Sequence, residues 1–528
     1  MRVGTKALSC SGVPVSIQNE DRGLLKTGLL PNMSERLPLR HSEGITPYFH
    51  NQPYREYIPR AEVGKRRAVF ARVNSSTRVF PTKVTIGIMA GWKGHFQGKK
   101  ITVMGLGLLG RAVGDVEFLA QNGADMIVTD LKGDDALRVS LNMLKPYPNV
   151  TYRLGGHAME DFKNRDFILK AAGIPFDSPY IAEAEKNGIP VKMSASWFAE
   201  LSNIPVVGVT GTRGKSTTTA MLHDIMKASG MRVLLGGNIR GVSTLALLPE
   251  VTRESIALME LDSWQCRGFG DEKISPTVAI FTSFFDDHLN YYHGDRNHYL
   301  EDKAQIFLNQ ESSDTLIAPK DVAHLLKENY GARIRSTLVI ADEKPLPKGW
   351  TLRVPGNHNI LNAQCALAAA RALGVDDDIS RKALAGFKGV AGRLELVREI
   401  KEVKIYNDTT ATTPEATIAG LRALDSGDKN IVLIMGGADK GLTMEGLISE
   451  AKRRAKKIIL LSGSGTGTIK DRLPDAPLYE RLDLALQDAI DSAEEGETVL
   501  FSPAFASFGM FKNEFDRGDQ FIALVEKL

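Results

Sequence analysis

A glycine-rich segment, VVGVTGTRGKST at residues 206–217, carries the residue types that bind phosphate. An apolar run precedes it and a helical pattern follows it, which is the order strand, phosphate loop, helix. Backbone N–H groups would surround an anion there, Lys215 would add a positive charge, and Ser216 or Thr217 would bind Mg²⁺. The loop itself consists of Gly211, Thr212, Arg213 and Gly214. The strict P-loop pattern has a glycine where this chain has Val209, so the segment predicts a nucleotide site but leaves its kind open.

Polar side chains end two further apolar runs of the same region. Glu260 ends the run IALME, where a carboxylate is costly unless it has a partner such as a metal ion. Asp287 and His288 follow the run VAIF, and Lys303 lies fifteen residues after His288. A lone histidine after a strand is more often structural, but this one would share a sheet edge with the phosphate loop and Glu260. The arrangement therefore favours a metal-dependent phosphate site.

A second glycine motif lies nearer the N-terminus. Gly105, Gly107 and Gly110 form GxGxxG between a strand-like and a helical stretch, and Asp130 lies 20 residues after the last glycine. This is the dinucleotide fingerprint, with phosphate expected at the helix N-terminus and the acid near the sugar or base. The alternative is that the glycines only permit tight packing of a strand against a helix.

Three successive α/β units must position these groups. Strands are expected at 255–261, 277–282 and 315–319, a helix at 356–374, and further buried strands after 393. Alternating strands and helices predict mostly parallel sheets, with ligands at the carboxyl ends of the strands. We expect a Rossmann-like unit, a P-loop ATPase unit and a second Rossmann-like unit. We expect an N-terminal extension at residues 1–95. The three units are expected, in the same order, at 96–193, 194–391 and 392–528.

Composition limits the classes of function. Hydrophobic residues make up 43% of the chain and charged residues 24%, as in globular proteins, and no apolar run is long enough for membrane insertion. Three cysteines in 528 residues favour a reducing cytoplasm over a disulfide framework.

Charge separates the N-terminal stretch from the rest. Residues 1–88 hold 14 basic and 6 acidic residues, whereas the remaining 440 hold 52 and 57, so the folded body is mildly acidic and nucleic acid is not an expected partner. We expect residues 1–88 to be a disordered tail or a stretch upstream of a true start at Met89, with a transit peptide as the alternative.

Several motifs together resemble the Mur ligase family of ATP-dependent amide-bond-forming enzymes. They are GVTGTRGKS, the strand-end glutamate, DH with a lysine fifteen residues on, GNHNILN, GRLE and YNDTTATTP, in that order over about residues 97–528. Within the family, GLGLLG, LKAAGIP, GGNI and SPAFASFGMFKNEFDRGDQF resemble the members that add D-glutamate to UDP-N-acetylmuramoyl-L-alanine in peptidoglycan precursor synthesis.

The resemblance implies a phosphate and metal site that makes an acyl phosphate from ATP and a carboxylate. Lys215 would bind phosphate, Ser216 and Glu260 would hold one Mg²⁺, and His288 and Lys303 would serve a second. An ammonium group has no lone pair for a cation, so Lys303 would have to be carbamylated. Four residues would approach the adenine, ribose and phosphates of ATP: Asn359, Asn362, Arg393 and Asp408.

The resemblance also implies where the two co-substrates bind. The first unit would hold UDP rather than NAD, and the third unit would hold D-glutamate. The UDP-linked substrate would contact Leu108, Leu109, Asp130 and Asn238. The amino acid would contact Thr412, Lys440, Ser507 and Phe508.

Three positions depart from the family pattern. Related enzymes commonly have a lysine where this chain has Thr410, so Thr412 and Lys440 would carry more of the amino-acid binding. Leu131 stands where a hydroxyl is often found, and KNEF replaces the usual order KNFE, which would leave the aromatic role to Phe515.

Three alternatives remain open on the sequence. One is another ligase of the family, adding a different amino acid or building polyglutamate on folate. The second is a NAD-dependent oxidoreductase, based on GxGxxG. The third is a non-enzymatic nucleotide-binding regulator. For the ligase itself we expect a monomer.

Overall fold

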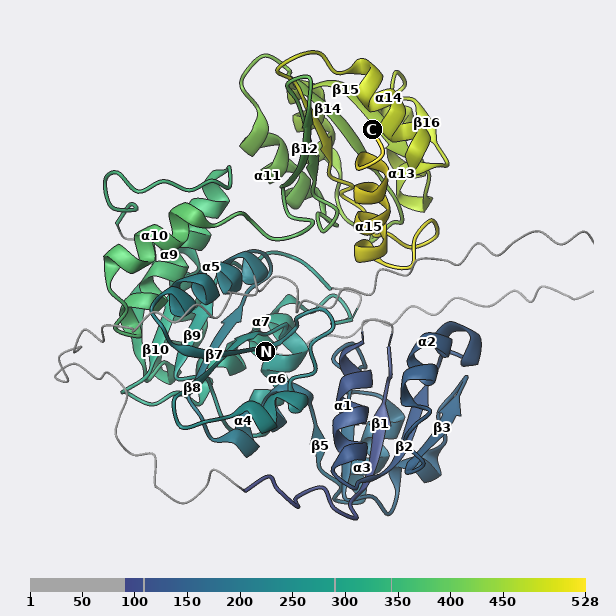
Figure 1. Cartoon of the computed structure of the whole chain (residues 1–528), viewed down its shortest axis with the longest axis vertical. Helices are drawn as coiled ribbons and strands as arrows, with labels where there is room; N and C mark the ends of the chain where they lie inside the picture. The colour runs from purple at the N-terminus through teal and green to yellow at the C-terminus, as the bar shows by residue number, and fades with distance from the viewer. Residues whose placement is uncertain (1–90, 108–109, 289–290, 343) are drawn as a thin grey trace, which may run out of the picture. The chain divides into compact units, whose positions relative to one another are not determined.

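The computed structural model describes residues 91–107, 110–288, 291–342 and 344–528. The expectations for residues 1–88 and for the start at Met89 lie outside these residues, as do Leu108 and Leu109. The described residues belong to one compact unit, Glu62–Leu528, and contain three sheets (Figure 1).

The first sheet has five parallel strands in the order β3-β2-β1-β4-β5. Its strands are β1 (Lys100–Met104), β2 (Asp125–Asp130), β3 (Val150–Leu154), β4 (Phe167–Lys170) and β5 (Val191–Lys192). Its helices are α1 (Arg111–Gln121), α2 (Asp134–Leu144), the short 3-10 turn η2 (Met159–Phe162) and α3 (Pro179–Lys186). The GxGxxG segment follows β1, at the carboxyl edge of this sheet.

The second sheet has six parallel strands in the order β11-β10-β9-β6-β8-β7. Its strands are β6 (Val206–Thr210), β7 (Arg232–Gly237), β8 (Ser255–Glu260), β9 (Val278–Phe281), β10 (Thr315–Ala318) and β11 (Thr337–Ile340). Its helical segments are α4 (Ser194–Ser202), α5 (Lys215–Ala228), η3 (Leu245–Glu250), α6 (Ser263–Asp271), α7 (Arg296–Leu308), α8 (Lys320–Tyr330), η4 (Gly331–Arg333), α9 (Asn357–Ala372) and α10 (Asp377–Gly386).

Strand order in this sheet places the phosphate loop between two other strand ends. β6 lies between β8 and β9, so the loop after β6 has Glu260 on one side and the segment after β9 on the other. Helix α5 packs against α9 and α10, and α6 packs against α7 (Figure 1). The strands expected at 255–261, 277–282 and 315–319 end within a residue or so of the observed ones, because each is a short, fully buried apolar run.

The third sheet has the order β12-β13-β17-β14-β15-β16, with β12 antiparallel to β13 and the other pairs parallel. Its strands are β12 (Glu395–Ile400), β13 (Val403–Asn407), β14 (Ile431–Gly436), β15 (Ala455–Leu461), β16 (Leu478–Tyr479) and β17 (Thr498–Phe501). Its helical segments are α11 (Pro414–Leu424), α12 (Glu445–Arg454), α13 (Ser464–Ile469), η5 (Lys470–Arg472), α14 (Leu482–Ser492) and α15 (Glu514–Val525). Mostly parallel α/β sheets are therefore confirmed.

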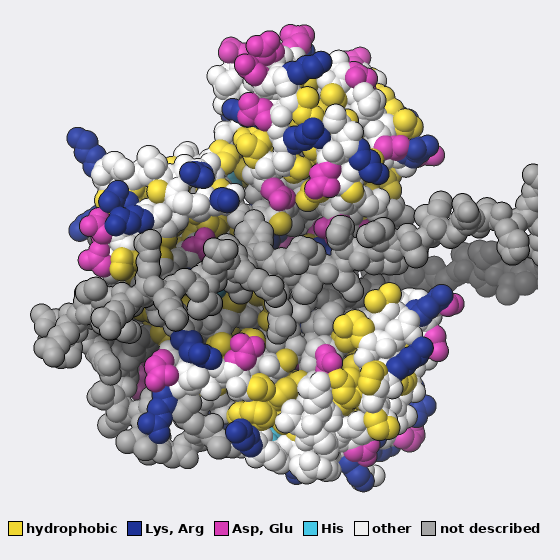
Figure 2. Space-filling model, in the orientation of Figure 1, with side chains coloured by type: hydrophobic (Ala, Val, Ile, Leu, Met, Phe, Trp, Pro, Cys, Tyr) yellow, Lys and Arg dark blue, Asp and Glu magenta, His cyan; other side chains and the backbone are white. Residues whose placement is uncertain are grey.

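Two surface observations bear on partners. In the described part of the chain, no helix is long and apolar enough to cross a bilayer. On the face drawn in Figure 2, basic and acidic side chains of the described residues are interspersed.

Candidate active site

The phosphate loop is fixed in shape by glycines and by the segment after β9. Gly211 and Gly214 have φ values of 139° and 88°, which favour glycine. The Arg213 carbonyl accepts hydrogen bonds from Thr282 Oγ1 at 2.5 Å and Ser283 Oγ at 2.9 Å. A Cβ on Gly211 would lie 2.2 Å from Thr282 Oγ1, so no larger residue fits without moving the loop.

Two lysines converge on one carbonyl oxygen of this loop. Lys215 Nζ, at the start of α5, and Lys303 Nζ, on α7, each donate to the Gly211 carbonyl at 3.0 Å. Burial, together with the charge of Lys303, lowers the pKa of Lys215 to about 8. Burial also lowers the pKa of Lys303, which is 1% exposed and lies over the Tyr299 ring at 4.8 Å. Two cations this close favour either an anion between them or neutralisation of one amine.

Glu260 ends β8 as a buried carboxylate beside the loop. Asn238 donates to it twice, from Nδ2 to Oε1 at 3.3 Å and from its backbone N–H to the Glu260 carbonyl at 2.7 Å. Arg111, at the start of α1, donates to Asn238 Oδ1. Among the described residues no lysine or arginine forms an ion pair with Glu260. A buried carboxylate without a paired cation suits a metal ligand.

Asp287 and His288 lie after β9, on the other side of the loop. Burial would raise the pKa of Asp287, but Arg213, His288 and Lys440 outweigh it and lower the value to about 2. Burial lowers the pKa of His288 to about 4, although the charge of Asp287 opposes the change. Since 41% of its side chain is exposed, solvent moderates that effect and the ring remains reachable. A neutral imidazole is the form that binds a metal ion.

The phosphate loop offers few protein ligands for the predicted Mg²⁺. The described residues contain no group of three or more His, Cys, Asp or Glu placed to hold a metal. Mg²⁺ is usually held by one or two carboxylates, with water and substrate phosphates completing the shell. Glu260 and Ser216 at the phosphate loop fit that requirement. Thr217 lies in the same first turn of α5 and is buried.

Two asparagines on α9 lie against the loop. Asn362 Oδ1 accepts from Thr218 Oγ1 at 3.4 Å, and a Cβ on Gly214 would lie 2.4 Å from the same oxygen. Asn362 Nδ2 donates to Asn359 Oδ1 at 3.2 Å. The structure therefore brings both predicted asparagines to the rim of the phosphate loop.

Of the two residues predicted from the third sheet region, Arg393 reaches this rim and Asp408 lies behind it. Arg393 Nη2 donates to Ser216 Oγ at 3.0 Å. Asp408 accepts from the Leu394 N–H at 3.1 Å and from Ser502 Oγ at 2.7 Å, but burial still raises its pKa to about 7. Arg393 thus contacts the phosphate loop directly, and Asp408 orients the residue next to it.

The residues predicted for the amino acid lie at the carboxyl edge of the third sheet. Lys440 Nζ donates to Thr412 Oγ1 at 3.3 Å. Ser507 is buried, and its neighbour Ala506 pairs with Ala438 in a short antiparallel bridge, which brings the segments of Lys440 and Ser507 together. Phe508 is 66% exposed and has no such partner among the described residues.

In the first sheet, Asp130 holds the glycine loop. Its Oδ2 accepts from the backbone N–H groups of Leu106 and Gly107 at 2.9 and 3.1 Å, and its Oδ1 accepts from Lys132 N–H at 2.9 Å. Gly105 has a φ of 90°, which favours glycine, and a Cβ there would lie 3.0 Å from Ala171 Cβ. The acid therefore shapes the loop, and its prediction as a uracil ligand stays a prediction.

Sequence reasoning missed the side-chain contacts of three arginines that connect these elements. Arg213 was assigned through its backbone, but its side chain donates to Thr413 Oγ1 at 2.7 Å. Arg517, only 1% exposed, donates to the Thr409 carbonyl at 2.7 Å and the Phe505 carbonyl at 3.2 Å. Arg111 contacts Asn238, as described above. The sequence offered one signal for these contacts, which was the arginine within GTRGKS.

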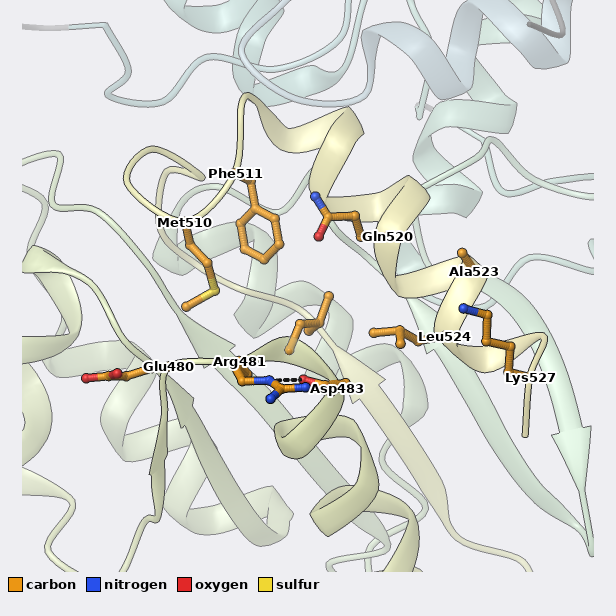
Figure 3. A pocket seen from close by; sticks show the side chains of 10 residues that line it. Glu480, Arg481, Asp483, Met510, Phe511, Gln520, Ala523, Leu524 and Lys527 are labelled. Atoms are coloured by element: carbon orange, nitrogen blue, oxygen red, sulfur yellow. Dashed lines mark hydrogen bonds and ion pairs between the residues drawn. The ribbon is translucent and has the colours of Figure 1, made fainter. Parts of the chain in front are cut away.

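A hollow of about 450 Å³ borders the segment of Ser507 (Figure 3). Met510 and Phe511 line one side, Gln520 and Leu524 on α15 line another, and the Arg481–Asp483 ion pair lies at its base. None of the predicted site residues lines it, so the hollow is separate from the residues described above.

Three family models match the chain. They are described as the Mur ligase MurD-like N-terminal domain at residues 99–193, the Mur ligase middle domain at 209–347 and the Mur ligase glutamate ligase domain at 392–505. The chain belongs to the Mur ligase family. Mur ligases are ATP- and Mg²⁺-dependent, and the oxidoreductase and non-enzymatic alternatives are thereby set aside.

Relatives and solved structures agree with this family. The chain is 36% identical over 465 residues to the UDP-N-acetylmuramoylalanine–D-glutamate ligase of Roseiflexus sp. RS-1, covering 81% of this chain and 98% of that protein. It is 33% identical to the enzyme of the same name from Borreliella burgdorferi ZS7, covering 81% and 97%. In fold it is similar to the Mur ligase MurC of Thermotoga maritima, with a TM-score of 0.54 at 19% identity, covering 81% of this chain and 99% of that one.

Proposed function

We propose that this Mur ligase joins D-glutamate to UDP-N-acetylmuramoyl-L-alanine in peptidoglycan precursor synthesis. The observation that carries the proposal is the convergence of groups at the Gly211–Lys215 loop. A buried carboxylate, the buried Lys303, the half-buried Lys215 and an arginine from the third sheet region meet there. The names of the relatives supply the identity of the two substrates.

The chemical difficulty of the first step is the meeting of two anions. The γ-phosphate of ATP must approach the carboxylate of UDP-N-acetylmuramoyl-L-alanine, and both are negatively charged. Lys215 would hold the phosphate, while Arg393 at Ser216 would add a second cation. The carboxylate oxygen attacks the γ-phosphorus, ADP leaves, and an acyl phosphate forms on the substrate. The amine of D-glutamate then attacks the acyl carbon and phosphate leaves.

Magnesium and a modified lysine would complete this site. Ser216 and Glu260 would hold one Mg²⁺, and His288 and Lys303 would serve a second. Bound there, Mg²⁺ would neutralise charge on the phosphate oxygens. The Lys303 ammonium group first loses one proton, and addition of CO₂ to the resulting neutral amine releases a second, so the cation beside Lys215 becomes a carbamate anion. The lowered pKa of Lys303 favours the neutral amine that this reaction needs.

We propose the remaining contacts as follows. Asn359, Asn362 and Asp408 would contact the adenosine of ATP. The UDP-linked substrate would bind along the carboxyl edge of the first sheet, at Asp130, Leu108 and Leu109, and reach Asn238. The amino acid would bind at Thr412, Lys440, Ser507 and Phe508. We also propose a monomer in the cytoplasm, which light scattering and fractionation would test.

A phosphate-release assay tests the proposal. Purified protein is supplied with ATP, Mg²⁺ and UDP-N-acetylmuramoyl-L-alanine, and D-glutamate, L-glutamate and L-alanine are added in turn. We expect release only when the UDP-linked substrate and D-glutamate are both present. Preferential release with L-alanine or L-glutamate would assign the chain to a different ligase of the family.

A further inference from the structure

Arg213 uses its backbone and its side chain for different purposes. Its backbone N–H donates to Ser283 Oγ at 2.8 Å and helps to shape the phosphate loop. Its guanidinium group leaves the loop, donates from Nη2 to Thr413 Oγ1 at 2.7 Å and lies 3.5 Å from an Asp287 carboxylate oxygen. The side chain therefore reaches the segment after β13, and the hydrogen bonds between the loop and Thr282 and Ser283 do not use its guanidinium group.

Lys440, in the loop after β14, reaches the same segment after β13. It donates to Thr412, the residue before the threonine that Arg213 contacts. Asp287 is close enough to both cations to stabilise them, and Arg213 is among the cations that lower the pKa of Asp287. Two cations thus contact two consecutive threonines and face one carboxylate.

The local charges leave a surplus of positive charge. Burial lowers the pKa of Lys440, and the charged groups with the largest further effects on it are the carboxylates of Asp287 and Glu514 and the guanidinium groups of Arg213 and Arg517. The guanidinium group of Arg517 donates hydrogen bonds to the carbonyls of Thr409 and Phe505. A guanidinium group has five N–H donors in a planar fork that matches a carboxylate, and Arg213 uses few of them.

We propose that Arg213 is a specificity-determining residue that binds a carboxylate of the amino-acid substrate, together with Lys440. The inference rests on the proposed function, which places that substrate at Thr412 and Lys440. The new element is that a cationic side chain of the phosphate loop binds the amino-acid substrate and selects for it. The nucleotide loop and the amino-acid site are then joined through a single side chain, whose backbone shapes one and whose guanidinium group binds at the other.

Kinetic constants for each substrate separate this role from a role in ATP binding. Arg213→Gln removes the charge and leaves the backbone N–H in place. We expect its KM for D-glutamate to rise roughly 10- to 100-fold, as for loss of a charge-assisted hydrogen bond, while the KM for ATP stays within about twofold. Arg213→Lys keeps a cation but not the fork, and should recover part of the loss.

Two control variants distinguish substrate binding from a tie between segments. Arg240→Gln removes another arginine of similar reach, which pairs with Asp519 at 3.0 Å and lies over the Phe515 ring. Thr413→Val removes the hydroxyl that Arg213 contacts but keeps the charge. Both should leave the KM for D-glutamate within about twofold of the wild-type value.

Two outcomes would overturn the proposal. If the KM for ATP rises in Arg213→Gln and that for D-glutamate does not, the guanidinium group serves phosphate. If Thr413→Val reproduces the full loss, the arginine only ties two segments together. Wild-type protein is assayed first, and failure to use D-glutamate would overturn the proposed function itself. In that case the KM of each variant is measured for the amino acid that the wild-type protein does use. We expect the loss of Arg213 to raise that KM in the same way.

Discussion

Replacing Gly211 by alanine tests whether the phosphate loop has the shape that the structure gives it. The new Cβ would lie 2.2 Å from Thr282 Oγ1, 2.8 Å from Ser283 N and 3.0 Å from Ser283 O. Two of these three atoms belong to the backbone, so they cannot turn away as a flexible side chain could. The loop, or the end of β9, must move instead.

The expected cost has two parts. A positive φ of 139° strains any residue with a Cβ by about 1–3 kcal/mol. Overpacking against a fixed backbone adds about 1–3 kcal/mol. Together they predict a loss of roughly 2–6 kcal/mol in the free energy of unfolding of this part of the molecule. Movement of the loop would also separate Lys215 from the position that phosphate must occupy.

Gly230, at the other end of α5, is the matched control. It also has a positive φ, of 80°, but a Cβ there would meet nothing within 4 Å. Gly230→Ala should therefore cost only about 1–2 kcal/mol and leave ATP binding intact. Urea unfolding and titration with ATP, followed by calorimetry, measure both quantities. If Gly211→Ala binds ATP as the wild type does and unfolds no earlier than Gly230→Ala, the described loop geometry is wrong.

Three further predictions concern buried charged groups. Lys303→Ala should lose about 10²-fold or more in turnover, with partial rescue by added short carboxylic acids. Lys303→Arg should stay inactive because arginine cannot form the carbamate, and full activity of that variant would contradict the second metal site. Burial raises the pKa of Asp408 to about 7, above its unfolded value, so ionisation favours unfolding as pH rises between about 4 and about 7. The wild type should therefore lose up to about 4 kcal/mol of its free energy of unfolding over this pH range, and Asp408→Asn should not. Equal pH dependence of the urea midpoints in the two proteins would argue against this explanation. Arg517→Met should destabilise the protein by about 2–5 kcal/mol, because the Thr409 and Phe505 carbonyls lose their donor, whereas exposed Arg481→Met should cost less than about 0.5 kcal/mol. Similar thermal shifts in the two variants would refute this.

The fold and the phosphate loop could be predicted because local patterns determine them. The buried runs before Gly211 and up to Glu260 are continuous apolar strands, and parallel pairing brings their carboxyl ends to one edge. Lys303 could be placed near them only through the family resemblance. Its contact with the Gly211 carbonyl depends on how α7 packs, and spacing along the chain does not encode that packing.

Side-chain contacts over long sequence distances could not be predicted. Arg213 and Thr413 are 200 residues apart, and Arg517 contacts Thr409 across 108 residues. No periodicity or motif connects such positions, because the contact arises from tertiary packing. Asp130 shows a second limit. Its ligand role stays a prediction, and the motif did not show that both of its oxygens also accept hydrogen bonds from backbone N–H groups of its own sheet edge.

The most direct test of the central claim follows an oxygen atom. UDP-N-acetylmuramoyl-L-alanine labelled with ¹⁸O in its terminal carboxylate is supplied with ATP, Mg²⁺ and D-glutamate, and the released phosphate is analysed by mass spectrometry. If the substrate carboxylate attacks the γ-phosphorus at the Lys215 loop, one labelled oxygen moves into phosphate for each amide bond formed. Phosphate without label, released while the amide product accumulates, would contradict an acyl phosphate at this site.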